Sequence, residues 1–116
     1  MANLIGTGTF YGNDHPNIYK DWCVGAFIAN KDFNTDKCEF KFQRGKKGLL
    51  REPKEVLHKE TTTLAIIIYG CIRLNFGDDK DYILQDEGDY IIWSPDIPHA
   101  FEFMDDSLVI TLRWNK

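Results

Sequence analysis

The sequence predicts an all-β domain, a sandwich or a barrel, on three observations. Short runs rich in aromatic and β-branched residues follow one another at close spacing, and turn residues separate them. Aromatic residues make up 14% of the chain, and such residues suit the pleated surface of a sheet. No stretch keeps a helical periodicity for more than about two turns. A chain of 116 residues is long enough for one such domain.

The strands and turns can be placed in order along the chain. Residues 1–20 are rich in turn-forming residues, so we expect an irregular N-terminal arm, followed by a single domain over 21–116. The run 62–69 is mostly apolar and β-branched, which is typical of a strand covered on both faces. The only candidate helix, near 47–57, contains a glycine and a proline that disfavour it. We predict eight or more strands, from runs at 22–29, 38–44, 62–69, 71–76, 81–84, 89–93, 100–103 and 107–114.

Charge and cysteine content limit the classes of partner and the compartment. The net charge is −4 and the basic residues are not clustered, unlike those of a nucleic-acid-binding protein. The longest apolar run, 64–69, is too short to cross a bilayer, and no signal peptide is visible at the N-terminus. Three cysteines without a CxxC pair favour a reducing compartment. We therefore predict a soluble cytoplasmic protein that binds neither nucleic acid nor membrane.

A glycine turn, a strand, a proline turn and a histidine follow one another in the C-terminal half. Gly88 permits a tight turn before the strand, and Pro95 ends it. His99 then shares a strand face with Phe101 and Phe103, so we expect its side chain to point inward. The segment resembles the second motif of the cupin superfamily, in which a histidine in this position points into a barrel.

A weaker likeness to the first cupin motif lies near His58. That motif places two histidines two residues apart, then a glutamate, then a strand that ends in glycine. Counted back from Gly70, His58 takes the place of the second histidine. Val56 takes the place of the first histidine, and Thr63 takes that of the glutamate.

The resemblance covers roughly residues 38–114 and implies a cupin-type double-stranded β-helix, a jelly-roll barrel with a central pocket. Of the family's three histidines and one glutamate, this chain keeps His58 and His99 as candidate metal ligands. Two imidazoles alone make a weak site for a metal such as Fe, Mn, Ni or Zn. Cys71 or Glu39 could complete the ligand set from a neighbouring strand, or water and a bidentate substrate could do so.

Seven residues are candidates for the pocket, each with a structural alternative. The aromatic residues could equally form plain core, His58 could lie on the surface, and His99 could be a hydrogen-bonded core histidine. Arg113 shares a strand face with Val109 and Thr111. Its head could lie in water at the strand end, or anchor a carboxylate or phosphate at the mouth of the pocket. The candidates are His58, Thr63, Tyr69, Trp93, His99, Phe101 and Arg113.

Three functions remain open at this point, and whether the chain is an enzyme is one of the open questions. The first is the binding of a small molecule in the barrel pocket without a catalytic metal. The second, which the family implies, is a metal-dependent enzyme such as a dioxygenase, isomerase or lyase. The third is a module that acts through its homodimer interface. We expect a homodimer in any case, because so many aromatic residues leave an apolar patch to cover.

Overall fold

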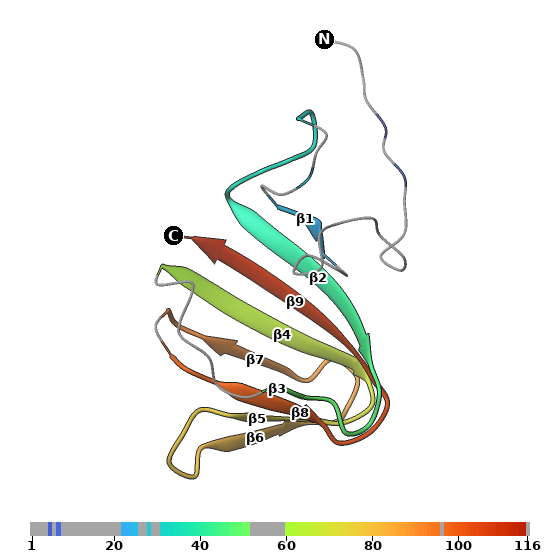
Figure 1. The fold of residues 1–116 in the computed structure, drawn as a ribbon, viewed down its shortest axis with the longest axis vertical. Coiled ribbons are helices and arrows are strands. Elements are labelled where there is room, and N and C mark those ends of the chain that lie inside the picture. Colours follow the sequence, from blue (N-terminus) through green and yellow to red (C-terminus); the bar gives the residue numbers. More distant parts are fainter. Residues whose placement is uncertain are drawn as a thin grey trace.

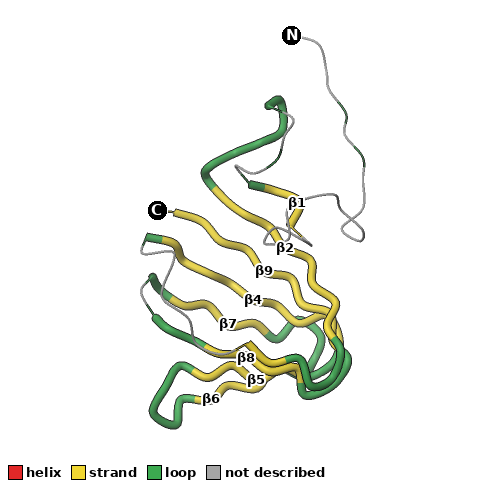
Figure 2. The backbone as a smooth tube through the Cα atoms, in the orientation of Figure 1, coloured by secondary structure: helices red, strands yellow, loops and turns green. Residues whose placement is uncertain are grey.

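Nine β-strands in two antiparallel sheets make up the described part of the chain (Figure 1). The structure is a computed structural model, and it describes residues 5, 7, 22–25, 28, 31–51, 60–95 and 97–115, with only the backbone at 22 and 23. No helix occurs among these residues (Figure 2), which confirms the all-β prediction. Consequently none of them belongs to a helix that could span a bilayer.

The two sheets have five and four strands. In order across it, the first sheet contains β1 (Trp22–Val24), β2 (Cys38–Gly45), β9 (Ser107–Asn115), β4 (Thr61–Tyr69) and β7 (Tyr90–Trp93). The second contains β3 (Leu50–Arg51), β8 (Ala100–Phe103), β5 (Ile72–Asn75) and β6 (Asp81–Leu84). Eight of these strands fall within or beside the predicted runs.

Strand β3 is the one that the sequence does not predict. It lies in the segment of the only candidate helix, whose last residues, 52–57, lie outside the described ones. Leu50 pairs with Glu102 and Arg51 with Phe101, so this strand is held by a distant partner rather than by a local pattern. The expected N-terminal arm, residues 1–20, likewise lies outside the described residues except for residues 5 and 7.

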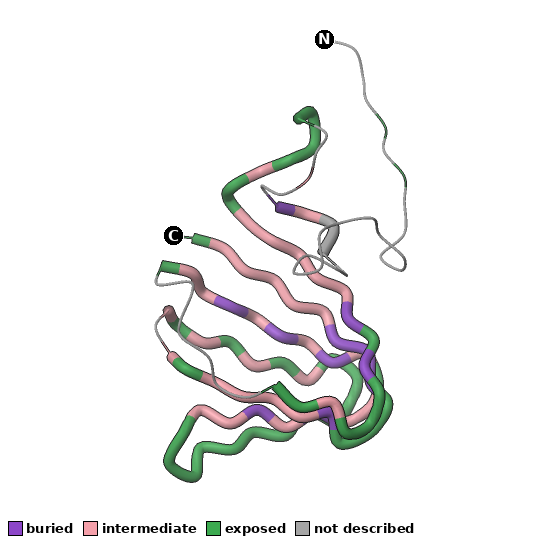
Figure 3. Tube along the Cα trace, viewed as in Figure 1, coloured by how far each residue is buried: buried purple, intermediate pink, exposed green. Residues whose placement is uncertain are grey.

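The hydrophobic core lies between the two sheets. Buried positions alternate along β4 (Figure 3). Ala65 and Ile67 are buried and therefore point inward, while Leu64 and Ile66 point outward. Both sheets contribute to the cluster of buried apolar side chains, which consists of Ala65, Ile67, Ile72, Leu74, Leu84, Phe103 and Val109. The inward direction of β2 and β7 follows from their pairing with these residues, Gln43 with Val109 and Ile91 with Ala65.

The end of the barrel at the β4–β5 turn is closed by tight backbone packing. Gly70 has a φ of +101°, and a Cβ there would lie against Ser107 and the backbone of Asp106. Ser107 is fully buried; its Oγ accepts a hydrogen bond from the Cys71 N–H (3.0 Å) and donates one to the Asp105 carbonyl (2.8 Å). The glycine that ends this strand is therefore required by its conformation and by the close approach of β9.

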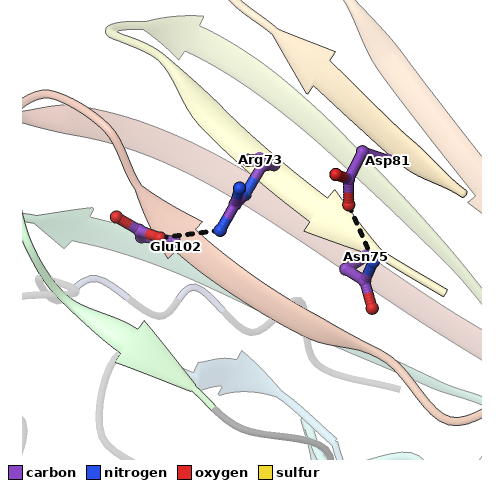
Figure 4. A network of polar contacts seen from close by, with 4 residues as sticks. All are labelled: Arg73, Asn75, Asp81 and Glu102. Carbon is purple, nitrogen blue, oxygen red and sulfur yellow. Dashed lines mark hydrogen bonds and ion pairs between the residues drawn. The ribbon is translucent and has the colours of Figure 1, made fainter. Parts of the chain in front are cut away.

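Polar side chains pair across the outer face of the four-stranded sheet. Arg73 on β5 donates a hydrogen bond to Glu102 on β8 at 3.0 Å, and Asn75 donates one to Asp81 on β6 at 2.7 Å (Figure 4). Both pairs join residues that lie directly opposite each other on neighbouring strands. Such cross-strand pairs suit a face in contact with water.

The outer face of the five-stranded sheet is apolar instead. Strand pairing places its outward residues in two rows, Phe40–Leu112–Leu64–Ile92 and Phe42–Ile110–Ile66–Tyr90. We call these eight residues the outer apolar face. Two of them are strongly exposed: Tyr90 by 64% and Ile92 by 50%. The five-stranded sheet therefore presents a continuous apolar surface, whereas the outer face of the other sheet carries polar pairs beside the exposed Leu50 and Ile83.

Candidate functional site

One row of residues crosses the inner side of the five-stranded sheet. Strand pairing places Glu39 on β2 opposite Arg113 on β9, Arg113 opposite Thr63 on β4, and Thr63 opposite Trp93 on β7. Directly paired residues share a face of the sheet. Thr63 is only 6% exposed and lies two residues from the core residue Ala65, so this face is the inward one. We call these four residues the inner row.

His99 approaches the inner row from the other sheet. It directly precedes β8, and its ring centroid lies 4.8 Å from that of Trp93 and 5.9 Å from that of Phe76. Phe76, which directly follows β5, meets Trp93 edge to face with centroids 5.4 Å apart. Trp93, Phe76 and His99 form an aromatic cluster that joins the two sheets at the level of the inner row.

The hydrogen bond of His99 fixes its tautomer. Nδ1 lies 3.2 Å from the carbonyl oxygen of Ile97. Because a carbonyl oxygen can only accept, Nδ1 donates, and the neutral ring then carries its lone pair on Nε2. Burial lowers the pKa of His99, the bond to Ile97 opposes this, and the charge of Arg113 lowers the pKa further. The ring is therefore neutral at pH 7, with Nε2 able to accept a proton or hydrogen bond.

Replacing His99 with glutamine should make the stability less dependent on pH in the weakly acidic range. In the unfolded chain a histidine has a pKa of about 6.5, and the folded protein lowers that pKa. The unfolded state therefore binds more protons, and stability present above the unfolded pKa is lost as the pH falls through the folded pKa. Urea unfolding between pH 7 and pH 5 should show a steeper loss for the natural protein than for His99→Gln. Equal slopes would contradict a neutral, buried ring.

Arg113 forms an ion pair within the inner row. Its Nη1 lies 3.5 Å from Oε2 of Glu39, and the two side chains are 27% and 32% exposed. Burial lowers the pKa of Arg113 and Glu39 raises it, and a guanidinium remains charged in either case. The Arg113 head lies beside Glu39 on the inward face of the sheet, and its role as an anchor for a ligand stays a prediction.

Two of the sequence candidates lie elsewhere, and a third lies outside the described residues. Tyr69 is 45% exposed at the other end of β4, six residues and about 20 Å from Thr63. The structure does not bring it to the inner row, so we remove it from the candidate pocket. Phe101 faces inward but packs on the core, with its ring 5.6 Å from that of Phe103. His58 and Val56 lie outside the described residues, so the place of His58 in the pocket stays a prediction.

The described side chains do not fit a complete metal site. Within ranges 31–51, 60–95 and 97–115, no three His, Cys, Asp or Glu side chains gather as such a site requires. Cys71 cannot supply a ligand, because it lies beside Ser107 at the closed end of the barrel. Glu39 does reach the inner row, but its carboxylate pairs with Arg113. His58 remains a predicted ligand.

Two residues that the sequence did not single out also belong to this part of the barrel: Lys41 and Phe76. Lys41 pairs with Thr111 and therefore shares the inward face of Glu39 and Arg113. The sequence held one indication of this inward face, because Glu39 and Arg113 have opposite charges and lie on two predicted strands that can pair. Phe76 carried no comparable signal, because it lies just beyond the end of its strand.

A separate groove of about 990 Å³ lies between the edges of β6 and β7. It shares Phe76 and Trp93 with the aromatic cluster, but His99 and Arg113 do not line it. Its lining also includes Tyr90 and Tyr82, and the ring of Tyr82 meets that of Phe76 edge to face with centroids 5.8 Å apart. The groove is a neighbouring feature, and an experiment on the inner row must distinguish the two.

Solved structures identify the fold. A cupin superfamily protein from Desulfitobacterium hafniense is 17% identical, with a TM-score of 0.61 over 72% of each chain. KdgF from Halomonas sp. is 18% identical, with a TM-score of 0.61 over 95% of this chain and 96% of that one. The chain has a cupin-type fold. A sugar phosphate isomerase from a cupin superfamily of Silicibacter pomeroyi is 15% identical, with a TM-score of 0.56 over 70% of this chain and 52% of that one.

These likenesses confirm the double-stranded β-helix that the second motif predicted. At such identities they establish the fold of the cupin-type domain and no particular activity. No family sequence model and no curated protein matches the sequence.

Proposed function

We propose that this cupin-type domain binds a small molecule inside its barrel. The observation that carries the proposal is the convergence of His99 and Trp93 with Thr63 and Arg113 at one level of the interior. Ligand sites in proteins typically combine an apolar, aromatic wall with a few convergent polar groups. The aromatic cluster supplies the wall, and the inner row supplies the polar groups.

The ion pair supports a ligand-binding role over a purely structural one. The two side chains are 27% and 32% exposed, and an ion pair that stays partly hydrated contributes little to stability, so apolar residues would serve a core at least as well. The neighbouring layer of the same sheet includes Ala65, which shows that this interior accepts apolar side chains. Glu39 and Arg113 therefore suit a site that must recognise polar atoms.

Replacing Trp93 with alanine should weaken the binding of any ligand of this site by at least about tenfold, or ~1.4 kcal/mol. The reason is that Trp93 contributes the largest ring of the aromatic cluster. A set of small aromatic acids, sugars and sugar phosphates would be screened by saturation-transfer NMR. Trp114→Ala is the matched control, because Trp114 pairs with Cys38 and Thr62 on the other face of the sheet. Because Trp93 also lines the groove between β6 and β7, Tyr90→Ala tests that groove alone and should leave the affinity unchanged. Equal binding by Trp93→Ala and Trp114→Ala, an equal loss in Tyr90→Ala, or no binding by any compound would contradict the proposal.

A metal-dependent enzyme is the second candidate function. The observation in its favour is the neutral imidazole of His99, whose Nε2 lone pair is the form that binds metal. The solved neighbours also include a protein named as a sugar phosphate isomerase. Elemental analysis of protein purified without an affinity tag or chelator tests this candidate. Stoichiometric Fe, Mn, Ni or Zn would support the enzyme. A metal content below about a tenth of an equivalent would contradict it and favour the binding of a small molecule without a metal.

We also propose that two copies associate through the outer apolar face. The face spans four strands, about 19 Å at the usual strand spacing, and its longest strands are about 30 Å long. It is rich in aromatic and aliphatic side chains, as the centres of homodimer interfaces are. The outer face of the other sheet is mixed, because the exposed Ile83 and Leu50 lie beside the polar pairs that Arg73 and Asn75 make there.

We also propose that the protein resides in the cytoplasm. Cys38 and Cys71 both carry free thiols. Free thiols are typical of proteins in a reducing compartment such as the cytoplasm.

A further inference from the structure

We infer that the groove between β6 and β7 binds an extended segment of a partner protein, which adds to the edge of β7 as a sixth strand of its sheet. The segment is apolar along the residues that pair, and basic residues flank it on both sides. The inference is independent of the small molecule proposed inside the barrel, because the segment lies outside the barrel, along the edges of its two sheets.

The edge of β7 offers backbone groups to a further strand. Strand β7 ends its sheet and pairs only with β4 in the described part of the chain. The Ile67 N–H donates to the Asp89 carbonyl at 3.0 Å, and hydrogen-bonded pairs alternate along an antiparallel ladder. The backbone groups of Ile91 therefore point toward β4, whereas those of Tyr90 and Ile92 point toward the groove. Two N–H and two carbonyl groups are thus available at the spacing of a β-ladder.

The side chains of β7 do not protect this edge. Exposed edge strands usually carry a charged residue or a proline that prevents another strand from pairing. The sequence of β7 is Tyr-Ile-Ile-Trp, which contains neither and consists of residues that favour strands. Such an edge suits β-augmentation, in which backbone hydrogen bonds hold an added strand and neighbouring side chains select it.

The opposite wall of the groove is the edge of β6. The Phe76 N–H donates to the Lys80 carbonyl at 3.1 Å, so the same alternation directs the backbone groups of Asp81 and Ile83 away from β5, toward the groove. Asp81 places a charge on this edge, which is a common protection against strand addition. We therefore assign the added strand to β7 and treat β6 as the other wall.

Both faces of the added strand meet apolar neighbours. On the outer side of the sheet it continues the two rows that end at Ile92 and Tyr90. On the inner side it lies beside Ile91 and Trp93, with Tyr82 on the opposite wall of the groove. Neighbouring side chains on one face of a sheet stabilise the pairing of its strands. The partner segment is therefore apolar on both faces, as β4 is at the other edge of β7.

Both ends of the groove are acidic. The β6–β7 loop, 85–89, contains three acidic residues and no basic one, and the β5–β6 turn, 77–81, contains three acidic residues and one lysine. The turn lies at the Trp93 end of the groove, because Phe76 beside it contacts that ring. Basic residues on both sides of the paired segment complement these charges. A second copy of β7, paired antiparallel, would instead bring its own acidic loop to this turn, where like charges repel.

The probe for this inference is the acetylated and amidated octapeptide Lys-Lys-Val-Ile-Val-Ile-Lys-Lys, with affinity measured by fluorescence anisotropy. It should bind the natural protein at least about tenfold more tightly than the same peptide with glutamates in place of the lysines. Ile92→Pro should weaken binding at least about tenfold, because it removes a groove-facing N–H but no bond to β4. Ile83→Pro is the matched control: it removes a groove-facing N–H from the opposite wall and should leave the affinity unchanged.

Amide hydrogen exchange measured by NMR distinguishes strand addition from other modes of binding. A saturating concentration of the lysine peptide should slow exchange of the Tyr90 and Ile92 amides at least about tenfold, because both gain a hydrogen bond. The Ile91 amide, which already bonds to β4, should change little. Binding of the peptide without slower exchange at Tyr90 and Ile92 would overturn the inference.

The remaining outcomes are equally decisive. No binding of the lysine peptide at about 1 mM would overturn the inference, and equal affinity for the two peptides would overturn the basic flanks. A loss of affinity in Ile83→Pro alone would place the added strand on β6. Exchange at Tyr90 and Ile92 that slows with rising concentration of the protein alone would assign the edge to a second copy and overturn the partner segment.

A charge reversal carries the test if Ile92→Pro fails to fold. Glu87→Lys changes an exposed residue of the acidic β6–β7 loop and should weaken binding of the lysine peptide about threefold. Asp36→Lys reverses an equally exposed charge just before β2, on the far side of the same sheet, and should have no effect. Equal effects of the two reversals would contradict the charge complementarity of the groove.

Discussion

Replacing Ile92 with aspartate should convert a dimer of this protein into a folded monomer. Ile92 is 50% exposed in the single chain, so the substitution removes little from the core. In the dimer it would bury an unpaired carboxylate in the outer apolar face, at a cost of several kcal/mol. We expect the dissociation constant to rise at least ~100-fold. Sedimentation velocity at micromolar concentrations measures the change.

Ile83→Asp provides the matched control for this experiment. Ile83 is 47% exposed, on the outer face of the four-stranded sheet, where it pairs with Arg73. The substitution Ile83→Asp should therefore leave the dimer intact. A natural protein that sediments as a monomer would contradict the homodimer, and dissociation by Ile83→Asp alone would assign the interface to the opposite sheet.

Replacing Gly45 with alanine should destabilise the domain by about 3 kcal/mol, the upper part of the usual range for overpacking. A Cβ at Gly45 would overlap the ring of Phe103, which is 1% exposed within the core and has no room to move. Urea unfolding monitored by circular dichroism measures the loss.

Gly48→Ala separates this clash from ordinary glycine effects. Gly48 has a φ of +93°, but a Cβ there would meet no atom within 4 Å, so only backbone strain of about 1 kcal/mol is expected. Combining Gly45→Ala with Phe103→Leu should cost less than the sum of the two single changes, because the smaller side chain makes room. A Gly45→Ala variant no less stable than Gly48→Ala would contradict the packing described here.

The strands were largely predictable because their signals are local. Alternation and turn residues located β6 at 81–84 and β8 at 100–103 with the bounds that the structure shows. The inward direction predicted for His99, from the strand face it shares with Phe103, agrees with its ring contacts to Trp93. Strand β3 has no such signal, since two residues become a strand only by pairing with β8.

The site was less predictable because it depends on register and on which face of each strand points inward. Alternation along β2 separates Phe40 from Lys41, but it does not say which of them faces the barrel interior. In the structure Lys41 does, and the phenylalanine belongs to the outer apolar face. The pairing of Glu39 with Arg113 joins residues 74 positions apart. Tyr69 was misplaced for a related reason: a strand covered on both faces gives no indication of which of its ends lies at the site.

The most direct test of the central claim follows ring resonances during an NMR titration with the tightest-binding compound of the fragment screen. A ligand inside the barrel should shift the signals of His99 and Trp93 together with one common saturation curve, because the two rings lie 4.8 Å apart at the inner row. The signal of Tyr90, which lines the groove between β6 and β7 and lies on the outer face of its sheet, should stay unchanged. A shift at Tyr90 without a shift at His99 would place the ligand in that groove and contradict binding inside the barrel.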